Sequence, residues 1–210
     1  MAKKIAIDIN DVLRDYTRQF AFVYKKYINK DFNIEYEDIN DFDFINVFPF
    51  YNEDGELDES LMNQFKYEDY SFEIYGRADA MDKMLPSKFN LWLQNTMRNF
   101  DDEKNPEIVL FSPFEMNLSI QSTLSFLARI GTRAREISFP TDSMKMWKDC
   151  DIMITANPNL INSTPEGKTC IKINTPYNKE AKCTYEFNSL MDVIDDENNT
   201  IINLIEKADD

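Results

Sequence analysis

Near its start, the chain runs from a short apolar segment, residues 5–7, directly into the carboxylate and amide groups of Asp8, Asn10 and Asp11. A short apolar run bounded by polar residues is typical of a strand buried in a sheet. In an open α/β sheet, ligands bind at the carboxyl ends of the strands. Asp8 is therefore a candidate nucleophile or metal ligand, and the equal alternative is an aspartate that caps the following helix.

Similar apolar segments recur along the chain and alternate with segments of helical spacing. We expect strands at residues 4–9, 107–111, 135–139, 151–154 and 169–173, and helices at about 12–28, 86–100, 116–130 and 200–207. Strands that alternate with helices predict a parallel sheet covered on both faces. The expected fold is α/β, a three-layer, Rossmann-like parallel sheet.

Residues 31–85 interrupt this alternation. The segment interleaves acidic residues with aromatic ones, and polar turns such as residues 52–55 divide it. We interpret it as a helical cap inserted into a core domain of residues 1–30 and 86–210. Its aromatic side chains are expected to form the core of the cap rather than a platform for stacking nucleobases.

The charge balance bears on the choice of partner. The chain has 38 acidic and 23 basic residues, a formal net charge of -15. Because nucleic-acid binding depends on clustered Lys and Arg, duplex nucleic acid is not an expected partner. Arg129, Arg133 and Arg135 form a local basic patch, which we interpret as a solvated or partner-facing surface.

The chain contains no histidine, which excludes Ser-His and Cys-His catalysis and removes the commonest zinc ligand. Its three cysteines, Cys150, Cys170 and Cys183, lack CxxC spacing, as is typical of a reduced intracellular protein. The apolar run before Asp8 is too short for a signal peptide or a spanning helix. We expect a cytoplasmic protein without a membrane partner.

Four polar groups follow one another in an informative order: Asp8, Ser112, Lys145 and the segment 151–158, whose sequence is DIMITANP. This order resembles the four motifs of the haloacid dehalogenase superfamily of phosphotransferases. It is most similar to the 5'(3')-deoxyribonucleotidase-like branch, which carries a helical cap after its first motif. The resemblance covers about residues 1–30 and 105–180, and it includes Pro176-Tyr177-Asn178, which is similar to the Pro-Tyr-Asn of that branch.

The resemblance implies an aspartyl-phosphate chemistry and shows where this chain departs from it. Asp8 corresponds to the nucleophile, and Ser112 and Lys145 correspond to the groups that bind the phosphoryl oxygens. The family's general acid and base, two residues after the nucleophile, is replaced here by Asn10. An amide cannot carry a proton in this role, and the loss of a general acid or base costs about 10² to 10⁴ in rate.

A second departure affects the metal. In the family, two adjacent carboxylates of the fourth motif hold magnesium, whereas this chain has Thr155 and Ala156 at those positions. Magnesium prefers hard oxygen ligands and usually retains one or two protein carboxylates. Asp8 is the remaining carboxylate of the inferred metal site, so we expect no resident cofactor, and Mg²⁺ only if the chain is active.

These departures predict a catalytically degenerate protein that acts through protein–protein contacts or self-assembly as a structural component. The composition, rich in Asn, Lys and Ile, suggests an AT-rich genome, and relatives of this branch are common in bacteriophages, so a phage virion is a natural setting. The alternative is a weak or altered Mg-dependent 5'-nucleotidase that uses Asp8 as nucleophile. A third hypothesis is a nucleotide or phosphate sensor that retains Ser112 and Lys145.

Overall fold

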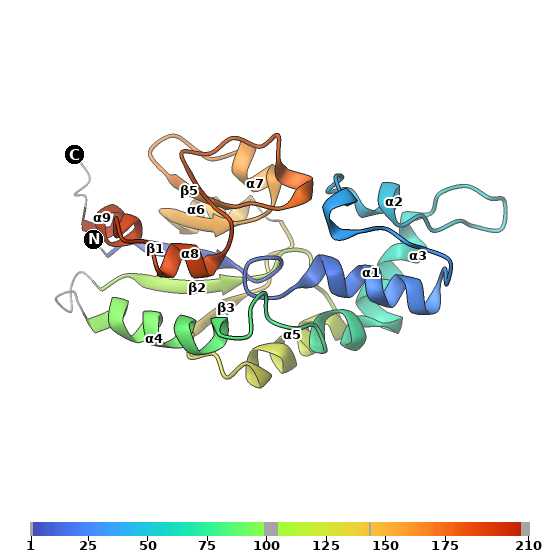
Figure 1. Cartoon of the computed structure of the whole chain (residues 1–210), viewed down its shortest axis with the longest axis horizontal. Coiled ribbons are helices and arrows are strands. Elements are labelled where there is room, and N and C mark those ends of the chain that lie inside the picture. The colour runs from blue at the N-terminus through green and yellow to red at the C-terminus, as the bar shows by residue number, and fades with distance from the viewer. Residues whose placement is uncertain (1, 99–104, 143, 207–210) are drawn as a thin grey trace.

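A single parallel sheet organises the computed structural model, which describes residues 2–98, 105–142 and 144–206 (Figure 1). Six strands pair in the order β3-β2-β1-β4-β5-β6, and each neighbouring pair is parallel. The strands are β1 (Lys4–Asp8), β2 (Glu107–Phe111), β3 (Glu136–Ser138), β4 (Ile152–Thr155), β5 (Thr169–Ile173) and β6 (Tyr185–Phe187). The sheet confirms the α/β fold that the sequence predicts.

Helices and helical turns surround the sheet. The α-helices are α1 (Tyr16–Tyr27), α2 (Phe44–Val47), α3 (Glu59–Gln64), α4 (Leu85–Arg98), α5 (Leu118–Arg129), α6 (Lys145–Asp149), α7 (Pro158–Asn162), α8 (Leu190–Ile194) and α9 (Thr200–Glu206). Two 3₁₀ turns are η1 (Tyr36–Asp38) and η4 (Pro176–Asn178), and two π-helical turns are η2 (Phe65–Asp69) and η3 (Phe72–Gly76).

The alternation of side chains along β1 explains the three layers. Ile5 and Ile7 point into one hydrophobic cluster with side chains of α4, α5, α8 and α9. Ala6 points to the opposite face and joins a second cluster with side chains of α6 and α7. Successive strand residues face opposite sides of a sheet, so the apolar run of residues 5–7 buries its side chains on both faces.

The cap has a hydrophobic cluster of its own beyond the carboxyl end of the sheet, at the right of Figure 1. Its aromatic rings pack on one another, as expected: Phe20 lies 5.3 Å, 5.0 Å and 5.7 Å from the ring centroids of Phe44, Phe48 and Phe65. Phe20 belongs to α1, so a helix that the sequence pattern assigned to the core domain packs with the cap. The division of the chain at residues 31 and 86 remains a prediction.

Several local expectations differ from the structure. The first helix begins at Tyr16 rather than at Val12, because Asp11 adopts a positive φ of 54° and the chain turns at residues 11–14. Val12 is buried in the core cluster from this turn. The predicted helix ends at Phe100 and at residue 207 lie outside the described residues. The short strand β6 was not predicted, because its three residues carry little periodic signal and depend on pairing with β5.

No helix in the described part of the chain has the length and apolar character that crossing a bilayer requires.

Candidate active site

Asp8 ends β1 and is almost completely buried, with 3% of its surface exposed. Its Oδ1 accepts a hydrogen bond from the backbone N–H of Asn10 (3.2 Å), and its Oδ2 accepts one from the hydroxyl of Thr155 (2.8 Å). Burial raises the pKa of Asp8 to about 7, against the lowering effect of these two hydrogen bonds. Near neutral pH the carboxyl group is therefore divided between its protonated and its ionised form.

Both the oxygen and the nitrogen of the Asn10 side-chain amide form hydrogen bonds. Its Oδ1 accepts hydrogen bonds from Arg14, at 3.0 Å from Nε and also from Nη2, and its Nδ2 donates to the hydroxyl oxygen of Ser112 (3.1 Å). The hydroxyl of Ser112 donates in turn to Oε1 of Glu115 (2.5 Å). Because the hydroxyl proton of Ser112 points at Glu115, the hydroxyl oxygen of Ser112 can only accept a hydrogen bond from residue 10. The amide of Asn10 provides the N–H donor for this bond, whereas an ionised carboxylate has none.

Arg14 and Glu115 form a buried ion pair beside this amide. Nη2 of Arg14 lies 2.6 Å from Oε1 of Glu115, and neither side chain exposes more than 1% of its surface. Thr123 on α5 donates to Oε2 of Glu115 (2.5 Å) and accepts from Nη1 of Arg14 (2.5 Å). The guanidinium also lies 4.8 Å from the centroid of the Tyr75 ring. Buried charges persist only when they are paired and hydrogen-bonded, and this pair is both.

Neither Arg14 nor Glu115 was predicted from the sequence as a site residue. Arg14 follows two apolar residues in the turn after β1, and Glu115 lies 101 residues later in the loop after β2. The adjacency of β1 and β2 in the sheet brings the two loops together. An arginine that continues a buried apolar run, as Arg14 follows Val12 and Leu13, is the one local signal that points to a buried cation.

Thr155 and Ala156, which the resemblance places at the family's metal carboxylates, have structural roles. The hydroxyl of Thr155 donates to Asp8 and accepts from the backbone N–H of Asn157 (3.0 Å). Ala156 is buried and has no polar side-chain atom. Oδ1 of Asn157 caps α7 by accepting from the N–H groups of Asn159 (2.9 Å) and Leu160 (3.4 Å).

The carboxylate of Asp11 is also occupied by hydrogen bonds within the protein. Its carboxylate accepts hydrogen bonds from the backbone N–H of Thr17 (2.9 Å), from the hydroxyl of Thr17 (2.6 Å) and from the hydroxyl of Tyr177 (2.7 Å). Burial raises its pKa, and these three hydrogen bonds oppose that rise. Asp11 thereby joins the start of α1 to the turn η4 that follows β5.

The oxygen atoms around Asp8 do not fit a magnesium site. Magnesium needs near-octahedral oxygen ligands, usually with one or two carboxylates among them. Here the hydroxyl of Thr155 is bonded to Asp8, Asp11 is bonded to Thr17 and Tyr177, and residue 156 supplies no ligand atom, so of the two aspartates only Asp8 remains as a candidate carboxylate ligand. Across the described residues, no group of three or more Asp, Glu, Cys or His side chains is arranged to hold a metal ion.

Of the four candidate site residues, three are linked to one another by hydrogen bonds. Asp8, Asn10 and Ser112 meet at the carboxyl ends of β1 and β2. Lys145 begins α6 with an exposed side chain, and it is not among the described residues that line the cavity beside Asp8. The hydroxyl of Ser112 is fully buried and is used by Asn10 and Glu115.

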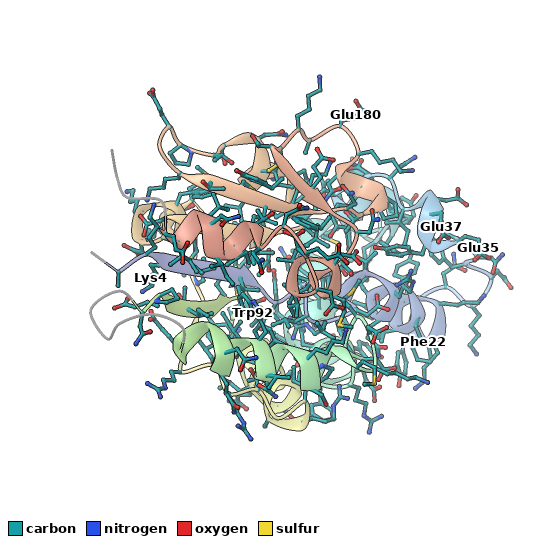
Figure 2. All side chains as sticks on the ribbon, turned by 60° about the vertical axis from the view of Figure 1, so that its left-hand side comes forward. Lys4, Phe22, Glu35, Glu37, Trp92 and Glu180 are labelled. Atoms are coloured by element: carbon teal, nitrogen blue, oxygen red, sulfur yellow. The ribbon has the colours of Figure 1, made fainter. Side chains whose placement is uncertain are left out.

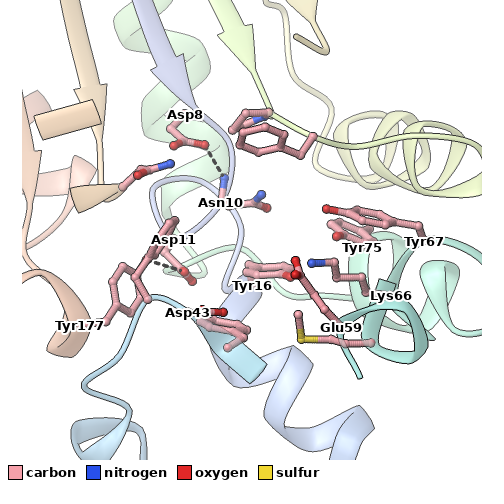
Figure 3. Close-up of a pocket in the computed structure, with 16 residues that line it drawn as sticks. Asp8, Asn10, Asp11, Tyr16, Asp43, Glu59, Lys66, Tyr67, Tyr75 and Tyr177 are labelled. Carbon is pink, nitrogen blue, oxygen red and sulfur yellow. Dashed lines mark hydrogen bonds between the residues drawn. The ribbon is translucent and has the colours of Figure 1, made fainter. Parts of the chain in front are cut away.

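A cavity of about 200 Å³ separates Asp8 from the cap (Figure 3). Its carboxylates and tyrosines come from both sides, and its lining includes Asp8, Asp11, Asp43, Glu59, Tyr16, Tyr67, Tyr75 and Tyr177. Lys66 of the cap is the ammonium group in this lining, and burial lowers its pKa to about 8 although Glu59 and Asp43 oppose the change. With four carboxylates against one ammonium, the cavity does not favour an anionic phosphate.

Comparison with known proteins identifies the fold. No protein-family model matches the sequence, and no curated protein matches it with significance. A haloacid dehalogenase-like hydrolase from Burkholderia xenovorans superposes with a TM-score of 0.58 over 96% of this chain and 99% of its own, at 8% identity. A haloacid dehalogenase-like protein of unknown function from Agrobacterium tumefaciens gives 0.56 over 99% and 100%, at 11% identity.

A third similar structure is a HAD-hydrolase from Bacillus subtilis bound to magnesium. It superposes with a TM-score of 0.53 over 97% of this chain and 100% of its own, at 13% identity. The chain therefore has the fold of haloacid dehalogenase-like hydrolases. At these levels of identity the likeness concerns the fold, and function is argued from the site.

Proposed function

We propose that this chain is a haloacid dehalogenase-like protein that does not hydrolyse phosphate esters and that works as a structural or assembly component through contacts with other protein chains. The proposal separates the scaffold, which is that of hydrolases, from the site, whose polar groups bond to one another. A bacteriophage virion is one setting for such a component, in line with the composition of the chain.

One observation carries the proposal: the amide of Asn10 is bonded on both sides, to Arg14 and to Ser112. A general acid and base at this position would have to donate a proton to the leaving group and later accept one from water. The amide protons of Asn10 are not acidic enough to be transferred near neutral pH. The hydrogen bonds of Asn10 indicate a structural role for the amide instead. The replacement is thus built into a hydrogen-bonded network rather than being an isolated substitution.

The metal position supports the same conclusion. A phosphoryl group in transfer carries negative charge that a metal ion or a cluster of cations must meet. Thr155 bonds to Asp8 where the family has a carboxylate, and Lys145 lies outside the cavity lining. Among the described residues that line the cavity, Lys66 is the single lysine, beside four carboxylates.

A hydrolysis assay tests the proposal. Purified chain and its Asp8→Asn variant would be incubated with deoxynucleoside monophosphates and with p-nitrophenyl phosphate, each with and without Mg²⁺. We expect equal background rates in all arms. Mg²⁺-dependent turnover that disappears in Asp8→Asn would contradict the proposal, whereas turnover common to both proteins would identify a contaminant.

The second candidate function is a weak Mg-dependent 5'-nucleotidase with Asp8 as nucleophile. It is favoured by one observation, that Asp8 lines a cavity roofed by the cap. Trapping with beryllium fluoride and Mg²⁺, followed by mass spectrometry of the native protein, separates the two functions. A stable adduct in the wild type and none in Asp8→Asn would support the nucleotidase.

A third use of the site is the binding of nucleotide or phosphate without turnover. A ligand that binds only the folded state raises the melting temperature. Thermal denaturation with millimolar phosphate or deoxynucleoside monophosphate is expected to show no shift, because the Ser112 hydroxyl is bonded to Glu115 and the cavity is acidic.

A further inference from the structure

The negative charge of the chain is concentrated in the cap. Residues 31–85, the predicted cap, contain sixteen acidic residues and three basic ones, while the remaining residues contain 22 acidic and 20 basic ones. Figure 2 shows Glu35 and Glu37 at the cap end and Lys4 at the opposite end of the molecule. The cap end of the molecule is therefore strongly acidic, whereas the remainder of the chain is nearly neutral.

At the cap end, the hairpin 50–58 projects from the molecule between α2 and α3 (Figure 1). Tyr51 and Leu57 pair across it in an antiparallel bridge, and they expose 59% and 52% of their surfaces. Glu53, Asp54 and Glu56 occupy the turn between them and are also exposed. The hairpin thus presents two adjacent large apolar side chains beside three carboxylates.

Internal hydrogen bonds hold the hairpin in shape. Oδ1 of Asn52 accepts from the N–H groups of Asp54 (3.0 Å) and Glu56 (2.9 Å), and the N–H of Asn52 donates to the carbonyl of Glu56 (2.9 Å). Gly55 takes the positive φ of 80° that the turn requires. A preorganised element loses little conformational entropy on binding, so these exposed apolar side chains are suited to docking.

At the opposite end, beside the amino ends of β2 and β3, lies a depression of about 660 Å³, which we call the basal pocket. Apolar side chains of Leu93, Pro106, Ile108 and Ala134 line it together with Arg133 and Arg135. The two arginines are exposed, and neither forms an ion pair with another described residue. Glu107 and Glu136 also line the pocket, and both are paired with Nζ of Lys4, at 4.0 Å and 2.8 Å.

We propose that the hairpin 50–58 of one copy docks into the basal pocket of the next copy, so that the chain assembles head to tail. Tyr51 and Leu57 meet the apolar lining, and the carboxylates of the turn meet Arg133 and Arg135. The two surfaces are different patches at opposite ends of the molecule, so the contact is heterologous and repeats into a ring or a filament. The proposal rests on the assembly role proposed above and names a second copy of this chain as the partner.

The contact depends on charge as well as on apolar area. Complementary charges raise the association rate and are screened by salt, since the Debye length falls from about 10 Å at 0.1 M to about 3 Å at 1 M. We expect sedimentation velocity of the full chain at rising concentration to show oligomers of the 24.8 kDa monomer. Raising the salt concentration to 1 M should weaken the association, because the attraction between the carboxylates of the turn and the two arginines is then screened.

Two double variants test the geometry. Tyr51→Ser with Leu57→Ser removes the apolar tip of the hairpin, and Arg133→Glu with Arg135→Glu reverses the charge of the pocket. Each variant alone should remain monomeric, because each copy lacks one of the two surfaces. Mixed in equal amounts they should form a one-to-one dimer and nothing larger, because each has one intact surface to offer the other.

The matched control is Leu91→Ser, which removes another large apolar side chain, 58% exposed on α4, from outside both surfaces. It should assemble like the wild type. Melting curves of all variants establish that they are folded. A wild type that stays monomeric at high concentration, or a mixture of the two double variants without a dimer, would overturn the proposal.

The assembly experiments and the hydrolysis assay give separate results, so a failure of the docking proposal can be told apart from a failure of the proposed function. Assembly that both double variants leave unchanged would exclude this contact but would keep an assembly role by another surface. Hydrolysis that depends on Asp8 would reject the proposed function irrespective of the oligomeric state.

Discussion

The guanidinium of Arg14 lies 2.6 Å from the carboxylate of Glu115, in an ion pair almost completely sealed from solvent. The pair joins the turn after β1 to the loop after β2, and through Thr123 it also holds α5. It lies beside the amide of Asn10, which the resemblance places at the position of the family's general acid and base. The same network thus ties the tip of the sheet to α5 and engages the polar groups of Asn10 and Ser112.

Removing one partner of the pair is expected to be costly. Glu115→Ala leaves the Arg14 cation buried without its counter-ion, and we expect the free energy of unfolding to fall by about 3–5 kcal/mol. The combined change Arg14→Met with Glu115→Leu should lose less, because no unpaired charge remains. Urea denaturation followed by circular dichroism measures both. A double variant less stable than Glu115→Ala would show that the charges are not the cause.

Placing a carboxylic acid at position 10 is expected to destabilise the chain without producing hydrolysis. In Asn10→Asp the bond from Nδ2 to the Ser112 hydroxyl is lost, which costs about 1–2 kcal/mol for a buried polar contact. Thr155 and Ala156 still supply no metal carboxylate, so hydrolysis of p-nitrophenyl phosphate should stay at background. The control is Asn10→Asp with Asp8→Asn. Turnover in the single variant above that control would contradict the structural role of Asn10.

The buried carboxyl of Asp8 predicts a stability that falls as pH rises. Its pKa is about 7 in the folded chain against 3.8 when unperturbed, so between these values the folded state keeps a proton that the unfolded state releases. The free energy of unfolding should decline by about 1.4 kcal/mol per pH unit in this window, by about 4 kcal/mol in total at most, and level off above pH 7.

Asp8→Asn removes this titration, and the neutral amide retains an acceptor for the N–H of Asn10. The variant should therefore be more stable than the wild type at pH 8 and similar to it at pH 4. Melting temperatures across pH 4–8 give the difference between the two proteins, in which the contributions of other carboxylates cancel. Parallel curves for the two proteins would refute the raised pKa.

Lys66 is expected to titrate well below the other lysines. Burial in the cavity lowers its pKa to about 8, whereas an exposed lysine titrates at about 10.4. After reductive methylation with ¹³C-formaldehyde, its NMR signal should shift with a midpoint near pH 8. The assignment follows from the signal that Lys66→Arg removes. A midpoint above pH 10 would place the ammonium group outside the cavity.

The sequence alone determined the class of fold, because apolar runs that bury both faces of a strand, alternating with helical spacing, leave few arrangements other than a covered parallel sheet. It also determined the chemistry of individual positions: Asn10 cannot transfer a proton, and Thr155 with Ala156 cannot supply carboxylates, wherever they lie in space. These are properties of the residue types themselves.

The tertiary structure decided which groups meet. It paired Arg14 with Glu115 across 101 residues of chain, and it assigned α1 to the aromatic cluster of the cap. It also turned Lys66 into the cavity and left Lys145 outside the lining. No local pattern contains this information, because contacts between distant residues depend on strand order and on the competition of many side chains for the same buried space.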